Sequence, residues 1–522
     1  MDAEVVQAVA DNMPKINRYL VEGYAKESMD DSVKFVDMTY RDAVRWGGNV
    51  IEYCGYRTLS PEDRAEKELE FVLKRKSRLS MAISERVLVE FKFRYQGKEY
   101  FTYIYMLYVS DGMLIVKDKR YAIHLGISEC VFARVHNKSK DGIIVRPIRA
   151  RLEFNRKSKA RFASVSSGEI LSEFVITTVL HHKEVGKRAC DPTVMLYLVC
   201  KFGFREVVRT MAGLTDDDIG FREYPDMTKA DEYEYFVATK ETRDPKVHLY
   251  VRKELLDNSH LVRKIVVNLL YTLTHFSFQT VDDVYDPKAR VWRIIMGIII
   301  YKPSLHAKAL ADADTHIQSV DTFIDPLTRE RFHYFGVNVD DIYQLLYYIF
   351  REIDRIMVNS SSNDLYSKRI DIIDGIFIAS YATAIYRRFY KTNQRPKLQD
   401  REVMNMLKIN PMVIEDAFSS RKNWGQSMHN ISLAPQIYGD NILLSCSIFK
   451  LRPSGKQSER AHPSFAVVES IMAFSGNTVG VNGLINPYLD ISRKTATSPG
   501  GAIIKPKRAA ELEVLKQYLP AS

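Results

Sequence analysis

The sequence is short of several residue types and motifs, and each absence narrows the class of protein. Its 522 residues include five cysteines and three tryptophans, without a Cys-x-x-Cys pair or a matching Cys/His cluster. This argues against a zinc site and favours a reducing, intracellular setting. The common phosphate-binding fingerprints Gly-x-x-x-x-Gly-Lys-Ser/Thr and Gly-x-Gly-x-x-Gly are missing, as is the Gly-x-Ser-x-Gly elbow of serine hydrolases. The sequence gives no local support for nucleotide hydrolysis.

Long apolar runs are also missing. The most apolar stretch, residues 291–301, is about half as long as a bilayer-spanning helix and contains Arg293. It therefore predicts a buried core segment. The start of the chain carries acidic side chains and no uninterrupted apolar stretch, which argues against a secretory signal peptide.

Positive charge is what the sequence does offer. The formal net charge is +10 and the sequence pI is about 9.0, which favours a polyanionic partner such as nucleic acid. Basic side chains gather at residues 74–78, 146–162 and 505–508, where phosphates could neutralise them and release counterions. In the second cluster, Arg149 and Arg151 alternate with apolar residues, as on a strand with one cationic face. Each cluster taken singly also fits a solvated surface.

Acidic and histidine clusters give little support for a metal site. Acidic runs occur at residues 216–218, 282–286 and 312–314, each without a second cluster to complete a cage. We interpret them as solvated faces or as helix N-terminal acids that complement the helix dipole. His181 and His182 are adjacent, so they point to different sides of a helix or strand. We interpret both as surface or partly buried side chains.

The pattern of apolar residues predicts an α+β fold. Residues 84–154 alternate in the manner of antiparallel hairpins, with Gln-Gly and Asp-Gly turn signals between the runs. From residue 169 to about residue 390 apolar residues recur mostly at helical spacing, and residues 340–357 form a clear amphipathic example. Another helical stretch is predicted at residues 399–420 and is followed by a strand-like segment at residues 441–451.

A segment near the C-terminus resembles a known family. "NPYLDISRKTATSPGG", residues 486–501, is similar to the stretch of the multisubunit RNA polymerase β subunit that reads Asn-Pro-Leu-Ser-Glu-Ile-Thr-His-Lys-Arg-Arg, then a variable spacer, then Gly-Pro-Gly-Gly. The residue or its chemical type is kept at Asn486, Pro487, Asp490, Ile491, Ser492, Lys494, Pro499, Gly500 and Gly501. Residues 507–514 resemble the Arg-Ala-Gly-Phe-Glu-Val run that follows in the family.

Two upstream stretches extend the resemblance in the family's order. Residues 113–154 are similar to a hairpin, a short Gly-Val-Phe-Phe step and a strand that ends in Leu-x-Phe-Glu. Residues 340–389 are similar to a helix, an Asp-Asp-x-Asp-His-Leu-Gly-Asn-Arg-Arg segment and a returning helix with paired arginines. The polar positions of this second stretch fall on Asp364, Lys368, Arg369, Arg387 and Arg388.

The resemblance implies the N-terminal half of a split β subunit, as in the RNA polymerases of giant bacteriophages of the phiKZ type. The expected parts are a β-rich protrusion-like domain at residues 1–165 and 395–465, a largely helical lobe-like domain at residues 166–394, and a fork-loop segment at residues 466–522. These phages carry a virion-packaged enzyme and an infection-stage enzyme, and we favour the infection-stage one. The expected location is the interior of the infected host cell, in the cytoplasm or a phage compartment, with the virion as the alternative.

The implied function is a subunit without the catalytic loop, which forms one jaw of the DNA cleft and the fork loop beside the RNA–DNA hybrid. The residues expected to contact nucleic acid are Arg493, Lys494, Ser498, Gly500, Gly501, Lys505, Lys507, Arg508, Lys368 and Arg369. Arg493 and Lys494 would donate charge-assisted hydrogen bonds to phosphates, and Gly500 and Gly501 would allow close backbone approach.

The resemblance also implies the chain's partners. These are a β C-terminal-half chain, β′-like chains, a possible promoter-specificity subunit, template DNA and RNA, and no membrane. No cofactor is expected in this chain, because the Asn-Ala-Asp-Phe-Asp-Gly-Asp loop that holds the catalytic magnesium belongs to β′ and is absent here. The isolated chain should be inactive. Thr495 and Ala496 replace a pair of arginines and Arg493 replaces a histidine, so rifamycin inhibition is expected to be weak or absent.

Charge and periodicity leave two other classes open. One is a basic virion structural protein that touches the genome, and the other is a promoter-recognition factor that contacts DNA. The ordered family landmarks distinguish the β-subunit interpretation from these two.

Overall fold

The computed structural model confirms the α+β class and divides into two compact units. Unit 1 comprises Met1–Cys130, Asp325–Gly336 and Ser362–Ser522, and unit 2 comprises Val131–Ile324 and Val337–Ser361. The structure describes residues 24–46, 51–75, 86–107, 113–116, 119–129, 131–137, 140–145, 147, 151–181, 191–239, 246–275, 280–301, 305–359, 368–371, 381–382, 384–386, 388–389, 397–409, 432–435, 450–453, 469–474, 481–485, 496–498 and 501–502. The predicted protrusion-like, lobe-like and fork-loop assignments stay predictions.

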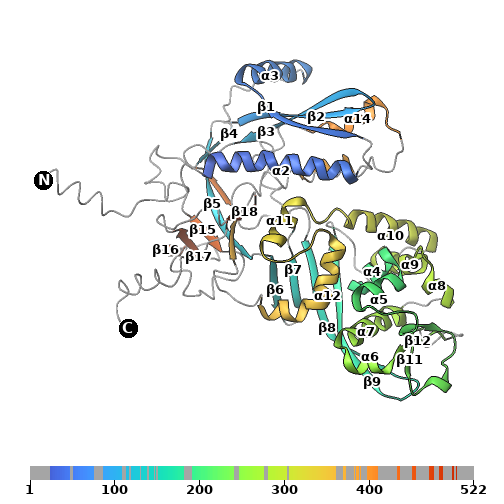
Figure 1. Ribbon diagram of the computed structural model, residues 1–522. Coiled ribbons are helices and arrows are strands. Elements are labelled where there is room, and N and C mark those ends of the chain that lie inside the picture. The colour runs from blue at the N-terminus through green and yellow to red at the C-terminus, as the bar shows by residue number, and fades with distance from the viewer. Residues whose placement is uncertain are drawn as a thin grey trace, which may run out of the picture. The chain divides into compact units, whose positions relative to one another are not determined.

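Unit 1 contains a three-stranded antiparallel sheet between two helices (Figure 1). Its elements are α2 (Tyr24–Trp46), β1 (Glu52–Thr58), α3 (Pro61–Arg75), β2 (Arg86–Tyr95) and β3 (Lys98–Leu107). On one face Tyr40 of α2 packs against Phe91 and Phe93 of β2, with ring centroids 5.0 Å apart in both pairs. On the other face Phe71 of α3 contacts Tyr103. Successive side chains of β2 point to opposite faces of the sheet, and those from Leu88 to Phe91 are buried on both faces.

The turn between β2 and β3 confirms the Gln-Gly signal in the sequence. Tyr95 pairs with Lys98, so the loop has two residues. Gln96 and Gly97 have φ angles of 50° and 76°. Positive φ at both central residues matches the twist of a tight hairpin, and glycine adopts it without a steric penalty.

A nine-stranded sheet contains the other strands that the structure describes in unit 1. Its order is β16-β17-β15-β5-β13-β19-β18, and β4 and β14 also pair with β5. The strands are β4 (Met113–Val116), β5 (Lys119–Glu129), β13 (Lys368–Asp371), β14 (Ser432–Pro435), β15 (Lys450–Pro453), β16 (Glu469–Phe474), β17 (Val481–Ile485), β18 (Ala496–Ser498) and β19 (Gly501–Ala502). Most pairs are antiparallel, whereas β15 runs parallel to β5. The long strand β5 thus organises segments drawn from distant parts of the chain.

Two further helices of unit 1 are held by polar contacts. They are α11 (Pro326–Tyr334) and α14 (Asp400–Leu407). Asp325 caps α11 by accepting a hydrogen bond from the Thr328 amide at 2.9 Å. Asp400 begins α14 and accepts a hydrogen bond from Tyr100 of β3 at 2.9 Å. The helix predicted at residues 399–420 is confirmed from Asp400 to Leu407, and residues 410–420 lie outside the described residues.

Unit 2 begins with a four-stranded antiparallel meander, β6-β7-β8-β9. Its strands are β6 (Phe132–Asn137), β7 (Lys140–Val145), β8 (Arg151–Ala163) and β9 (Ile170–His181). Helix α7 (His260–His275) contacts this sheet, since Asn268 accepts a hydrogen bond from the Ile176 amide at 2.9 Å and donates one to the Phe174 carbonyl at 3.1 Å. The Asn268 side chain thus satisfies backbone groups of the edge strand β9 and holds α7 against the sheet by hydrogen bonds.

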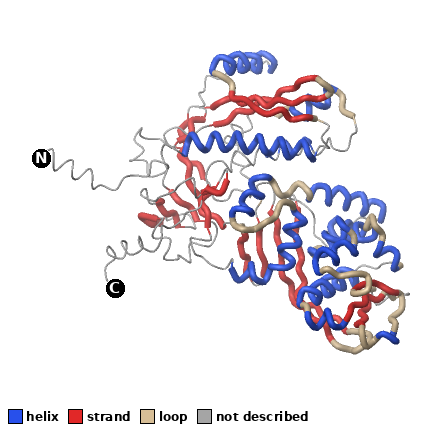
Figure 2. The backbone as a smooth tube through the Cα atoms, in the orientation of Figure 1, coloured by secondary structure: helices blue, strands red, loops and turns tan. Residues whose placement is uncertain are grey.

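Helices fill much of the remainder of unit 2 (Figure 2). They are α4 (Val194–Phe202), α5 (Phe204–Ala212), α6 (Lys253–Asn258), α8 (Val281–Tyr285), α9 (Arg290–Tyr301), α10 (His306–Val320) and α12 (Ile342–Asn359). The apolar run at residues 291–301 forms α9, where Trp292, Ile295 and Ile299 are buried. The prediction of a core segment is therefore confirmed. Gly297 lets α9 approach α10 closely, because a Cβ there would lie 2.1 Å from the Ala309 carbonyl oxygen.

A small second sheet interrupts the helical part of unit 2. Its order is β10-β12-β11, formed by β10 (Ile219–Arg222), β11 (Tyr233–Val237) and β12 (His248–Arg252), with the short helix η2 (Met227–Lys229) between β10 and β11. The predicted helical region thus also holds β9 and these three strands.

In the part of the chain that the structure describes, no single helix is both long and apolar enough to cross a membrane. Helices α9 and α10 pass such a test only when taken together, and they are bent by 86° at the break between them.

Candidate nucleic-acid interface

Two of the segments predicted to contact nucleic acid lie on neighbouring strands of unit 1. Lys368 and Arg369 are in β13, and Gly501 is in β19. The two strands pair antiparallel, with Asp371 opposite Gly501. The other edge of β13 pairs with β5, where Lys368 lies opposite Glu129. Segments about 130 residues apart in sequence therefore share one sheet.

The hairpin that includes Gly501 also contains Ser498. Strand β18 pairs antiparallel with β19, and Ser498 lies opposite Gly501. The backbone thus brings four of the predicted contact residues, Lys368, Arg369, Ser498 and Gly501, into three adjacent strands. The other predicted contact residues lie outside the described residues: Arg493, Lys494, Gly500, Lys505, Lys507 and Arg508.

The basic cluster on β8 has a different environment. The Arg156 guanidinium donates hydrogen bonds to Asp141 and Asp354, each at 2.8 Å, and stacks 4.6 Å from the centre of the Phe174 ring. Lys157 forms an ion pair with Asp191 at 3.3 Å. These cations are neutralised within unit 2, so they are poorly placed to release counterions on binding phosphates.

Lys264 completes this network from helix α7. Its side chain is 3% exposed, and its Nζ lies 3.3 Å from Asp354. Burial lowers the pKa of Lys264, and the attraction of Asp354 opposes that effect. Burial raises the pKa of Asp354, but the hydrogen bond from Arg156 and the charge of Lys264 outweigh it and leave the pKa below its ordinary value. Asp354 therefore stays charged and compensates two cations.

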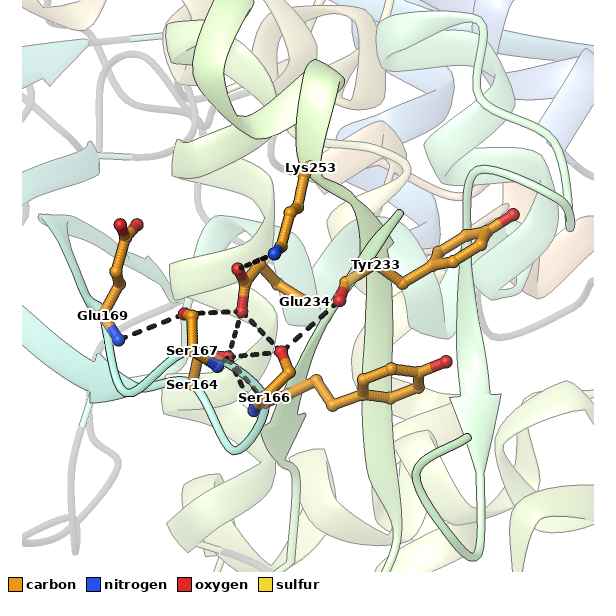
Figure 3. Close-up of polar contacts among 8 residues, drawn as sticks. Ser164, Ser166, Ser167, Glu169, Tyr233, Glu234 and Lys253 are labelled. Atoms are coloured by element: carbon orange, nitrogen blue, oxygen red, sulfur yellow. Dashed lines mark hydrogen bonds and ion pairs between the residues drawn. The ribbon is translucent and has the colours of Figure 1, made fainter. Parts of the chain in front are cut away.

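A second polar cluster joins the β8–β9 turn to β11 (Figure 3). One oxygen of Glu234 accepts hydrogen bonds from the hydroxyls of Ser164, Ser166 and Ser167, the latter two at 2.7 and 2.9 Å. Lys253 approaches the other oxygen at 3.4 Å. Burial raises the pKa of Glu234, but the hydrogen bonds from the serines and the charge of Lys253 lower it by more, so the pKa lies below its ordinary value. The carboxylate is fully engaged, and its role is to hold the turn against the small sheet.

Sequence reasoning missed this cluster. The Ser/Gly-rich stretch at residues 164–168 is a turn signal, but the carboxylate that the serines bind lies 67 to 70 residues later. No local spacing rule connects such positions, because the contact depends on how β11 pairs beside the hairpin.

The acidic runs that sequence analysis singled out have structural roles. Thr280 and Asp283 form a capping box at the start of α8, and Asp282 also lies in its first turn. Asp218 accepts hydrogen bonds from the Thr215 amide and hydroxyl at 3.0 and 2.7 Å. Among the described residues, no group of three or more His, Cys, Asp or Glu side chains is arranged to hold a metal ion.

Comparison with known families identifies the family to which the chain belongs. Residues 1–411 match the family described as "Non-virion RNA polymerase subunit". No curated protein sequence matches the chain significantly. The matched residues include β5 and β13, and they end before the segment at residues 486–501. Because the match covers well over half of the 522 residues, the chain belongs to the family of non-virion RNA polymerase subunits, and is a subunit of a phage multisubunit RNA polymerase.

Proposed function

We propose that the chain is the N-terminal part of a split β subunit, which forms one jaw of the DNA cleft and the fork loop beside the RNA–DNA hybrid. The observation that carries the proposal is the pairing of β13 with β19, since it places the strand of Lys368 and Arg369 beside Gly501 of the segment at residues 486–501. The two stretches were identified separately from sequence, and their adjacency is what a common nucleic-acid surface requires.

The division of the chain also supports this proposal. Unit 1 draws on both ends of the chain, and unit 2 is built largely from the middle. The resemblance implies a similar nesting, with a lobe inserted between the start of the chain and a returning segment, although its boundaries at residues 165 and 395 differ from those of unit 2 at residues 131 and 361.

The chemistry assigned to this chain is binding and orientation. Arg493 and Lys494 would donate charge-assisted hydrogen bonds to phosphates near the hybrid, which fix register without reading base identity. The catalytic magnesium would be held by a β′-like subunit, and a β C-terminal-half chain would complete the cleft. A promoter-specificity subunit would complete the enzyme, which would act inside the infected cell.

A test combines assembly with activity. The tagged chain is purified with its polymerase, and Arg493→Ala plus Lys494→Ala is compared with Lys308→Ala, an exposed lysine of unit 2. Loss of two charge-assisted contacts should reduce RNA synthesis by about tenfold or more while the other subunits are retained. Unchanged synthesis by the double variant would contradict the proposed fork loop.

A promoter-recognition subunit is the second candidate. The observation in its favour is that the family match ends at residue 411, before the segment that most resembles β. The two candidates differ when this chain is removed from the enzyme. On a preassembled RNA–DNA scaffold, a polymerase without its promoter-recognition subunit would still extend RNA, whereas one without half of β would not. The family's description as non-virion argues against the structural virion protein.

Drug sensitivity tests the fork-loop assignment separately. Thr495, Ala496 and Arg493 stand where the resemblance expects two arginines and a histidine. The assembled polymerase should therefore resist rifamycin at concentrations that stop a bacterial enzyme. Inhibition equal to the bacterial enzyme in a parallel titration would remove this assignment.

A further inference from the structure

The loop between β10 and β11 presents two large apolar side chains to solvent. Tyr224 is 74% exposed and Met227 is 53% exposed. Aromatic residues and methionine are enriched at protein interfaces relative to the rest of a protein surface. Two of them in a loop of unit 2 therefore indicate a contact surface.

The loop is held in a defined conformation. The Asp226 carboxylate caps η2 by accepting a hydrogen bond from the Thr228 amide at 3.2 Å. Arg222, just before the loop, stacks 4.8 Å from the centre of the Tyr250 ring. Just after it, the Glu232 carbonyl accepts a hydrogen bond from the Lys253 amide at 2.9 Å. Both ends are anchored, so the exposed side chains are presented at little cost in conformational entropy.

The charge around these side chains is opposite to that of the chain. Residues 216–234 contain eight acidic and two basic residues, although the whole chain carries +10. Part of this charge is neutralised, since Asp216 pairs with Arg205 at 2.9 Å and Asp218 with Arg252 at 3.5 Å. Four acids are exposed and have no ion pair with another described residue: Asp217, Glu223, Asp231 and Glu232.

We propose that this surface, defined by Tyr224, Met227, Glu223, Asp231 and Glu232, binds a lysine- or arginine-rich segment of another subunit of the polymerase. Unpaired carboxylates attract such a segment, and Tyr224 and Met227 give it an apolar contact. The same carboxylates repel DNA and RNA phosphates, so nucleic acid is a poor occupant. The proposal depends on membership of the polymerase subunit family and not on the β assignment.

A photocrosslinking experiment on the assembled polymerase tests this proposal. The photoreactive residue p-benzoylphenylalanine replaces Tyr224, whose exposure makes the change neutral for folding. The matched control carries the same probe at Met404 of α14, which is 60% exposed and has no comparable acidic surroundings in sequence. Mass spectrometry then identifies the crosslinked polypeptide and peptide.

The Tyr224 probe should crosslink to a lysine- or arginine-rich peptide of another polymerase subunit. Adding Asp231→Lys and Glu232→Lys should reduce the yield by about tenfold or more, because each reversal places like charges together. A crosslink to DNA, to RNA, to a second copy of this chain or to a segment without basic residues would overturn the proposal. So would a polypeptide yield no higher than that of the Met404 control.

Two readings of the same preparation keep this test separate from the proposed function. Retained subunits and RNA synthesis show whether the polymerase is intact, and the crosslink shows what lies against Tyr224. A polymerase that remains intact but gives no crosslink contradicts this inference and leaves the fork-loop proposal standing. A Tyr224 crosslink to a basic peptide of another subunit would support this inference. If the Arg493→Ala plus Lys494→Ala variant then synthesises RNA as well as wild type, the fork-loop proposal alone is contradicted.

Discussion

Arg156 and Lys157 of β8 and the acids of the β10–β11 loop occupy the same unit but differ in how far other side chains neutralise them. The β8 cluster looked in sequence like a phosphate-facing surface, yet Arg156 is bound to Asp141 and Asp354. The sequence interpretation as a solvated face or helix start covered only residues 216–218 of this acidic stretch, whereas Glu223, Asp231 and Glu232 are exposed in the same loop as Tyr224 and Met227. The charge of a segment therefore does not tell whether it is available to a partner, because side chains from distant elements decide how much of it is already neutralised.

Removing Asp354 should have the largest effect on stability, because it tests whether the cations of this network depend on their partner. Asp354→Ala leaves buried Lys264 without its 3.3 Å partner and removes one acceptor of Arg156. We expect a loss of about 2–3 kcal/mol in stability, less than for a fully buried pair because Asp354 is half-exposed. Urea unfolding and hydrogen exchange of α7 and α12 amides measure it.

The matched control for this variant lies on the same helix. Glu352→Ala removes the partly exposed partner of the exposed Arg355, 2.7 Å away, and should cost at most about 0.5 kcal/mol because neither member of the pair is buried. If the two variants lose the same free energy of unfolding, the pair of Asp354 with buried Lys264 stabilises the fold no more than an ordinary surface pair.

Removing the Glu234 charge is expected to have the next largest effect. Glu234→Gln keeps the shape but weakens the hydrogen bonds from the serines and the pair with Lys253. The expected cost is about 1–2 kcal/mol, since hydrogen bonds to charged groups are the stronger ones. Faster amide exchange at the β8–β9 turn, without a change in α9, would locate the loss.

The same carboxylate predicts a pH dependence. The pKa of Glu234 is lower in the folded chain than its ordinary value of 4.5. Its stabilisation is therefore complete above about pH 4.5 and is lost as the pH falls through the folded pKa. The difference in melting temperature between wild type and Glu234→Gln should shrink on acidification. A constant difference down to pH 3 would contradict the assigned shift.

The smallest effect on stability is expected in the acidic loop. Glu223→Gln plus Asp231→Asn alters exposed carboxylates without an ion pair to another described residue, so the change in stability should stay within about 0.5 kcal/mol. Urea unfolding checks it beside Asp354→Ala. A loss as large as that of Asp354→Ala would show that these acids serve the fold of unit 2.

Local sequence patterns predicted a substantial part of the fold. The Gln96-Gly97 turn, the buried helix α9 and the amphipathic helix α12 each follow from residues close in sequence. The strand β9 was not predicted within the helical region, although its β-branched residues at 175–179 favour a strand; pairing with β8 and the hydrogen bond to Asn268 hold it in the sheet. Strand pairing is a non-local contact that periodicity cannot supply.

By itself the sequence determined the α+β class, the basic character of the chain and the resemblance to a polymerase subunit, since composition, turn chemistry and motif order are written along the chain. The tertiary structure decided which charges remain available. It paired β13 with β19 across about 130 residues. It neutralised Arg156 with Asp141 and Asp354 and left Tyr224 exposed in an acidic loop. The physical reason is that an ion pair or an exposed side chain depends on which elements lie beside it, and packing alone fixes that neighbourhood.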